Sequence, residues 1–212
     1  MRFILVALIA LLMGCSAAPV KTSVPKADGL GFTYTHNEPS KESFVPVENP
    51  VWISAAFTQD EKDILKAAMT EWNMSLNGYY EFTLMSENYM PRDEGPAEKY
   101  IADTYIGLLI TRISPADADE AVGEGVLAWV DGLRGHGMHV VADRMGTRRM
   151  KTVMLHEFGH VVGIGHVLIK GALMAPGYPY NAPCIDKVTV LQVGAMRPEW
   201  NWRNLNWCNW PQ

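Results

Sequence analysis

Residues 156–166, which read HEFGHVVGIGH, constrain the fold more than any other stretch of the chain. On a helix, His156 and His160 lie one turn apart on the same face, so that both imidazoles can bind a single Zn²⁺. Gly163 tolerates a positive φ, which lets the helix end there and brings His166 back as a third ligand. Three protein ligands leave one coordination position for water, as in catalytic rather than structural zinc sites. The stretch therefore predicts one catalytic zinc ion.

Glu157 follows the first predicted ligand directly and is expected to project beside the metal. A carboxylate in that position can take a proton from an attacking water that zinc has activated. Glu157 is therefore the predicted catalytic residue of a hydrolase. The alternative interpretation is a buried helix whose histidines are satisfied by ordinary hydrogen bonds.

The pattern HExxHxxGxxH, followed by Met174 in the run ALMAP, resembles the metzincin clan of zinc endopeptidases. The resemblance implies an α+β domain of the α/β/α type. It would have a mixed, twisted sheet of about five strands with an antiparallel edge strand, an active-site helix, a Met-turn and a C-terminal helix. It also implies that Met174 forms an apolar floor beneath the zinc ligands. Val167, after the third histidine, leaves the subfamily open.

Two further stretches resemble the parts of these enzymes that hold the substrate. Residues 125–130 (GVLAWV) resemble the edge strand, whose unpaired N–H and C=O groups can bind an extended peptide. The run PGY at 176–178 resembles the wall of a specificity pocket in matrixins, although a simple turn is the alternative. The predicted substrate-binding residues are Gly125, Val126, Leu127, Ala128, Pro176, Gly177 and Tyr178.

Other metals have weaker support. Matrixins hold a structural zinc with histidines on two strands, but Trp129 stands where one of these would be, so we doubt a second zinc near His139. A calcium site in the acidic stretch 117–124 is conceivable, because carboxylates suit a hard cation. Its spacing fits no known calcium loop, however, and a solvated acidic loop is the preferred interpretation.

The N-terminus reads as an export signal. Arg2 precedes an apolar run at 3–13, which is about half the ~20 residues that a membrane-spanning helix needs. The run ends in LMGC, which resembles a bacterial lipobox and implies lipidation of Cys15 and cleavage before it; an ordinary cleaved signal peptide is the alternative. Ser16 resembles the residue that directs lipoproteins to the outer membrane in Gram-negative cells.

The predicted organisation is a signal peptide at 1–14, a flexible membrane tether at 15–50 and one peptidase domain at 51–212. Beyond Cys15 only Cys184 and Cys208 remain, and outside the cytoplasm a disulfide between them is the default expectation. The formal net charge of −5 and the lack of a basic cluster argue against nucleic acid as a partner. The expected partners are a protein or peptide substrate and, through Cys15, a membrane, and we expect a monomer.

Hydrophobic periodicity and turn residues place the elements. A capping box at Thr58 and Glu61 starts a helix that ends at Asn77 and Gly78, with Trp72 on its apolar stripe. The other expected helices are 149–162 and 185–196, the expected strands are 51–57, 79–85, 105–113, 125–130 and 138–142, and loops are expected at 87–98 and 117–124.

The predicted function is a zinc-dependent endopeptidase that hydrolyses peptide bonds of extended substrates. One alternative is a non-catalytic zinc-binding surface lipoprotein, against which the presence of Glu157 counts. The other is a peptidase restricted to cell-wall peptides, which sequence alone does not separate from a general endopeptidase.

Overall fold

The computed structural model describes residues 34–37, 46–92, 95–177 and 184–209. The predicted signal peptide, the lipidation site Cys15 and the pocket residue Tyr178 lie outside these ranges. Among the described residues, no helix is both long and apolar enough to cross a membrane.

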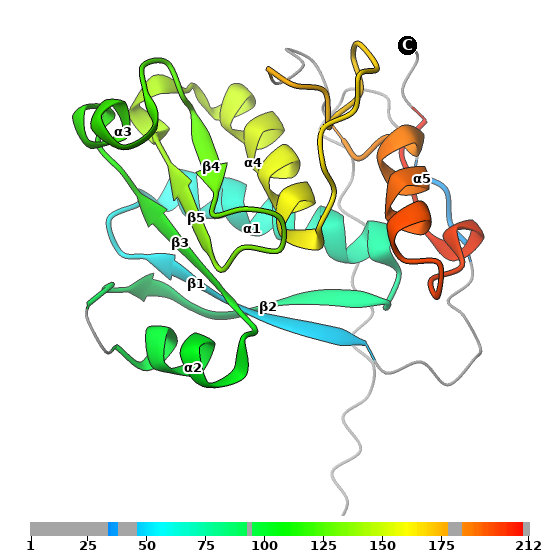
Figure 1. Ribbon diagram of the computed structural model, residues 1–212, viewed down its shortest axis with the longest axis horizontal. Coiled ribbons are helices and arrows are strands. Elements are labelled where there is room, and N and C mark those ends of the chain that lie inside the picture. The colour runs from blue at the N-terminus through cyan, green and yellow to red at the C-terminus, as the bar shows by residue number, and fades with distance from the viewer. Residues whose placement is uncertain (1–33, 38–45, 93–94, 178–183, 210–212) are drawn as a thin grey trace, which may run out of the picture. The chain divides into compact units, whose positions relative to one another are not determined.

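The centre of the fold is a five-stranded mixed sheet with the strand order β2-β1-β3-β5-β4 (Figure 1). The strands are β1 (Val47–Ser54), β2 (Tyr80–Tyr89), β3 (Leu108–Arg112), β4 (Ala128–Val130) and β5 (Gly137–Val140). The pairs β1–β2, β1–β3 and β3–β5 are parallel, whereas β4 runs antiparallel to β5 at the edge of the sheet. The predicted α+β fold with an antiparallel edge strand is confirmed.

Helices cover the two faces of this sheet. They are α1 (Gln59–Leu76), α2 (Pro96–Thr104), α3 (Pro115–Val122), α4 (Thr147–Val162) and α5 (Lys187–Met196), with short 3-10 turns η1 (Ala142–Arg144) and η2 (Trp202–Asn204). In Figure 1, α1 and α4 lie on one face and α2 on the other. The alternation of side chains along β1 explains this arrangement. Val51 and Ile53 enter the main core, while Trp52 packs with Tyr89 and Ala97 of α2 in a separate small cluster.

Helix α1 forms as its sequence predicts. Thr58 and Glu61 make the reciprocal hydrogen bonds of a capping box, and Asn77 ends the helix in the left-handed conformation with φ 47°. Trp72 has no exposed surface, and its indole N–H donates to the carbonyl oxygen of Leu155 on α4 over 2.9 Å. Trp72 is therefore a core residue that joins α1 to the active-site helix.

Two predicted loops contain helices, and those predictions are wrong. The stretch 87–98 contains the end of β2 and the start of α2, and the acidic stretch 117–124 lies largely within α3. Both helices begin with a proline, which is favourable in the first turn, and Ser114 caps α3 by accepting from the backbone N–H of Asp117. Both are short, so they carry too few apolar residues for a clear helical period.

Residues upstream of the expected first strand also contact the fold. Strand β1 begins at Val47 rather than at Val51. Tyr34 forms an antiparallel bridge with Cys208, and the backbone N–H of Thr35 donates to the carbonyl oxygen of Trp207 over 2.9 Å. The domain boundaries stay a prediction.

Candidate active site

The three predicted ligands converge at the C-terminal end of α4. This helix ends at Gly163, whose φ of 107° is the left-handed conformation that the sequence predicts. On the helix, Nε2 of His156 lies 3.1 Å from Nε2 of His160. The turn after Gly163 brings back His166, whose Nε2 lies 3.2 Å from Nε2 of His156. These are the members of a group of three possible metal ligands whose ligand atoms all lie within 4.8 Å of one another.

The hydrogen bonds of two of these histidines fix which ring nitrogen faces the centre. Nδ1 of His156 lies 2.7 Å from the carbonyl oxygen of Leu173, and Nδ1 of His160 lies 2.7 Å from that of Ile164. A carbonyl oxygen only accepts, so in both rings Nδ1 carries the proton and Nε2 presents a lone pair.

The residues present fit zinc. Tetrahedral Zn²⁺ with Zn–N bonds of about 2.0–2.1 Å separates two ligand nitrogens by roughly 3.3–3.4 Å. The separations of 3.1 and 3.2 Å from His156 to the other two histidines are close to that value. Three neutral imidazoles are also a donor set that zinc commonly takes in catalytic sites.

Burial keeps two of these histidines in the neutral form that a metal requires, while the third is exposed to solvent. Burial lowers the pKa of His156 to about 4, and burial also lowers the pKa of His160. Both rings are therefore neutral at physiological pH, as metal binding requires. His156 is buried, His160 is half-buried and His166 is exposed, so the group faces solvent on the side of His166.

Glu157 lies on α4 next to His156, with 2% of its surface exposed. Its position in the helix puts it beside the first ligand, as the sequence predicts. Its catalytic role stays a prediction, as do the Met-turn role of Met174 and the substrate contacts.

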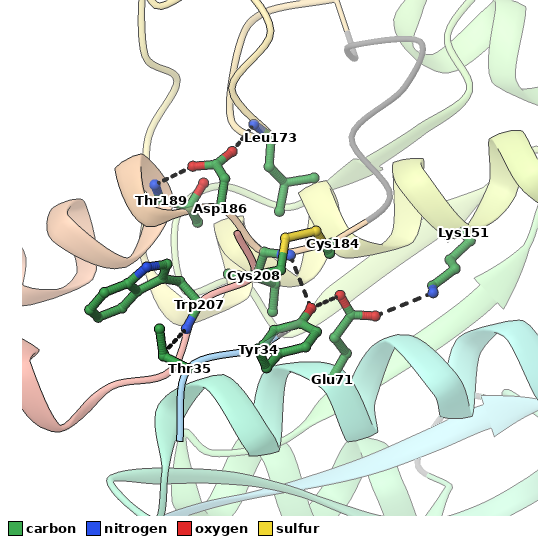
Figure 2. The surroundings of a disulfide bond; sticks show 11 residues. Tyr34, Thr35, Glu71, Lys151, Leu173, Cys184, Asp186, Thr189, Trp207 and Cys208 are labelled. Carbon is green, nitrogen blue, oxygen red and sulfur yellow. Dashed lines mark hydrogen bonds and ion pairs between the residues drawn. A yellow bond between two sulfur atoms is a disulfide. The ribbon is translucent and has the colours of Figure 1, made fainter. Parts of the chain in front are cut away.

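Met174 lies under the active-site helix. It is completely buried, and its backbone carbonyl oxygen accepts from the N–H of Val167 over 2.8 Å. Its sulfur and methyl group pack against Gly159, the residue before His160. The preceding residue, Leu173, supplies the carbonyl oxygen that orients His156, and its N–H donates to the carboxylate of Asp186 over 2.6 Å (Figure 2). The stretch around Met174 therefore contacts His156 itself and the residues next to His160 and His166.

This close packing makes Gly159→Ala a test of the floor beneath the site. A Cβ at Gly159 would lie 2.5 Å from the sulfur of Met174 and 3.3 Å from the ring of Trp72. We expect the substitution to lower the free energy of unfolding by about 1–3 kcal/mol, as for other overpacked cores. Urea unfolding of the zinc-loaded protein measures the change.

Gly165→Ala is the matched control, because a Cβ at Gly165 would meet nothing within 4 Å. A change within about 0.5 kcal/mol is expected there. Equal effects of the two substitutions would contradict the packing argument.

A cavity of about 1060 Å³ opens beside the histidines. Of the predicted substrate-binding residues, Gly125, Val126, Leu127 and Gly177 line it, together with His156 and His166. Ala128 lies in β4 with 3% of its surface exposed. Pro176 lines a separate groove of about 330 Å³, and Tyr178 lies outside the described residues.

The cavity is also lined by residues that the sequence prediction did not include, among them Arg144, Arg148 and Arg149. In the sequence these are three arginines directly before and within the start of the active-site helix. Sequence alone predicts no role for them, because only the fold shows that they line the cavity.

Among the residues that the structure describes, no second group of three or more histidine, cysteine or acidic side chains is arranged to hold a metal ion. His139 stacks on Trp129, and its ring nitrogens contact Thr111 and Asp131 at 2.8 and 3.2 Å. Asp119, in the acidic stretch considered for calcium, pairs with Arg144 instead. The predicted disulfide between Cys184 and Cys208 is present (Figure 2).

Part of the sequence is similar to a known protein family. Residues 97–190 match the family model of matrixin, a stretch that includes the three histidines and Met174. No curated protein matches the chain in sequence. Among solved structures, archaemetzincin from Methanopyrus kandleri is similar with a TM-score of 0.48 and 10% identity, over 74% of this chain and 98% of that one.

The assignment of metal and activity rests on the matrixin match at residues 97–190 and on the histidine geometry, since the structural likeness is too low to argue from. Zinc is therefore the cofactor, and the activity is hydrolysis of peptide bonds. The protein is a zinc metalloendopeptidase whose catalytic zinc is bound by His156, His160 and His166, and its residues 97–190 are similar to a matrixin domain.

Proposed function

We propose that this protein is a lipid-anchored endopeptidase of the cell envelope that cleaves extended peptides and uses Glu157 as its general base and acid. The observation that carries the proposal is the convergence of three imidazole Nε2 atoms next to a buried carboxylate and a large open cavity. That combination suits hydrolysis of a substrate larger than a single small molecule.

Zinc bound at the histidines supplies Lewis-acid activation of water and of the scissile carbonyl group. Glu157 accepts a proton from the attacking water as the water oxygen bonds to the carbonyl carbon. The same carboxyl group then donates this proton to the amine nitrogen as the C–N bond breaks. The hydrogen bonds to the carbonyl oxygens of Leu173 and Ile164 hold the imidazoles of His156 and His160 in one orientation throughout.

The edge of the sheet supports an extended peptide as the substrate. Strand β4 is the last strand in the sheet order, and Gly125, Val126 and Leu127, directly before it, line the cavity. Backbone groups at such an edge can pair with an added strand. The peptide would thereby pass in front of the zinc ligands.

The location outside the cytoplasm is supported by the disulfide, because such bonds persist in oxidising compartments. The lipobox-like LMGC sequence at Cys15 supports a lipid anchor. We further propose that the protein acts as a monomer with this anchor as its link to the membrane.

One experiment tests these elements together. The full chain and its Cys15→Ser variant are expressed in a Gram-negative host, and zinc content and cleavage of a peptide library are measured for the purified proteins. We expect about one zinc per chain in both and cleavage that a chelator abolishes and added zinc restores. The wild type should fractionate with membranes and the variant should not.

The other outcomes separate the alternatives. Zinc binding without cleavage would favour a binding lipoprotein, and cleavage of cell-wall peptides alone would favour the restricted peptidase. Folded protein without zinc would contradict the mechanism. An unchanged distribution of Cys15→Ser would contradict the lipid anchor without affecting the peptidase.

A further inference from the structure

The wall of the active-site cavity is cationic, although the chain as a whole carries a formal net charge of −5. Its charged lining consists of Arg144, Arg148 and Arg149 against the single carboxylate of Glu124, apart from the histidines. In an acidic protein, a local excess of positive charge at the cleft attracts anionic groups and repels cationic ones.

The three arginines have different surroundings. The guanidinium of Arg144 is taken up by the protein itself: it donates to the carbonyl oxygens of Val126 and Pro115 at 2.8 and 3.0 Å and pairs with Asp119 at 2.5 Å. Arg144 therefore holds the rim of the cavity at Val126. Arg149 is half-buried and Arg148 is exposed. No described residue forms a hydrogen bond or ion pair with the side chain of Arg148.

Arg148 and Arg149 are unfavourable for the helix that bears them. They lie in the first turn of α4, which contains no acidic residue. Positive charge near a helix N-terminus opposes the helix dipole and costs about 0.3–1 kcal/mol per charge. Residues whose charge opposes the helix dipole in this way are commonly retained because they serve a function. Arg148 and Arg149 line the same cavity as His156 and His166, which indicates that their function is to bind the substrate.

The spacing along α4 gives the expected position of the anionic group. Arg148 and Arg149 precede His156 by a distance of roughly 10–12 Å along the helix, at a rise of about 1.5 Å per residue. An extended peptide advances about 3.3 Å per residue, so three or four residues cover that distance. The flexible arginine side chain widens the range to about two to four residues.

We propose that this cleft selects peptides with Asp or Glu about two to four residues from the scissile bond, and that Arg148 and Arg149 recognise the carboxylate. The guanidinium group suits this role because its planar set of donors matches a carboxylate. The inference rests on the proposed peptidase function and specifies the substrate class of that same site.

The test uses pairs of peptides that differ only in Asp or Glu against Asn or Gln at one position near the cleavage site. With wild-type holoenzyme, we expect kcat/KM to be about five- to tenfold higher for the acidic member of a pair. The preference should shrink in high salt, because screening weakens exposed charge pairs. The cut sites identify the side of the scissile bond on which the acidic residue lies.

The variants are Arg148→Gln, Arg149→Gln, the double variant and Arg148→Glu. We expect the preference to fall in the single variants, to vanish in the double variant and to turn toward Lys-containing peptides in Arg148→Glu. Lys99→Gln is the matched control, because it removes an exposed positive charge on α2 outside the cavity. Zinc content should stay the same in every variant, whereas unchanged cleavage of both acidic and neutral peptides is expected only for Lys99→Gln.

The failures of the two proposals are distinguishable. Equal cleavage of acidic and amide peptides by the wild type, or an unchanged preference in the double variant, would overturn this inference and leave the peptidase function intact. If zinc-loaded enzyme cleaves no peptide of either kind, the proposed function and the inference are both overturned.

Discussion

Glu157→Gln is expected to lower kcat for peptide hydrolysis by about 10²- to 10⁴-fold, which is the usual contribution of a general acid–base group. The amide has nearly the same shape as the carboxyl group, so it fits a site where Glu157 is only 2% exposed. It cannot accept the proton of the attacking water or deliver it to the leaving amine. The three histidines are unchanged, so zinc content should stay at its wild-type level.

The measurement is single-turnover cleavage of one peptide, with zinc determined on the same samples. Glu71→Gln is a suitable control, because Glu71 is another buried carboxylate and lies on α1, where it pairs with Tyr34 and Lys151. Burial raises the pKa of Glu71. Glu71 does not line the active-site cavity, so its substitution is expected to change stability rather than kcat of the folded enzyme. Wild-type kcat in zinc-loaded Glu157→Gln would remove Glu157 from the mechanism.

The metal centre was predictable because its geometry is local. His156, His160 and His166 are ten residues apart at most, and helical spacing followed by a glycine turn determines their convergence. The capping box of α1 and the buried Trp72 were predictable for the same reason. The antiparallel edge strand followed from the resemblance to metzincins and is confirmed by the pairing of β4 with β5.

The parts that were not predictable depend on contacts between distant segments. Helices α2 and α3 are too short to show a period, and their proline starts were not weighed against the polar composition. The contact of Tyr34 with Glu71 and with the backbone N–H of Ile185 joins residues that no local pattern relates. The cationic wall is similar, since only the fold brings Arg148 and Val126 to the lining of one cavity.

The disulfide ties the C-terminal segment to the site, and its removal is expected to have the largest effect on stability. Cys184 and Cys208 are 24 residues apart, and closing a loop of that length contributes about 3 kcal/mol to the free energy of unfolding. We expect a Cys184→Ala/Cys208→Ala variant to lose about that amount in urea unfolding. Reduction of the wild type should give a similar loss, whereas the double variant should not respond to a reductant.

The loss of stability should reach the zinc site through a series of hydrogen bonds, of which Figure 2 shows those of Asp186 to Thr189 and Leu173. The backbone N–H of Cys208 donates to the carbonyl oxygen of Ile185 over 2.9 Å, next to Asp186, whose carboxylate caps α5 at Thr189 and accepts from the N–H of Leu173. The carbonyl oxygen of Leu173 in turn orients His156. Because each contact constrains the next, zinc release and unfolding should shift together to lower urea in the double variant. If the double variant unfolds at lower urea but releases zinc at the same urea concentration as the wild type, the disulfide and the metal centre are independent.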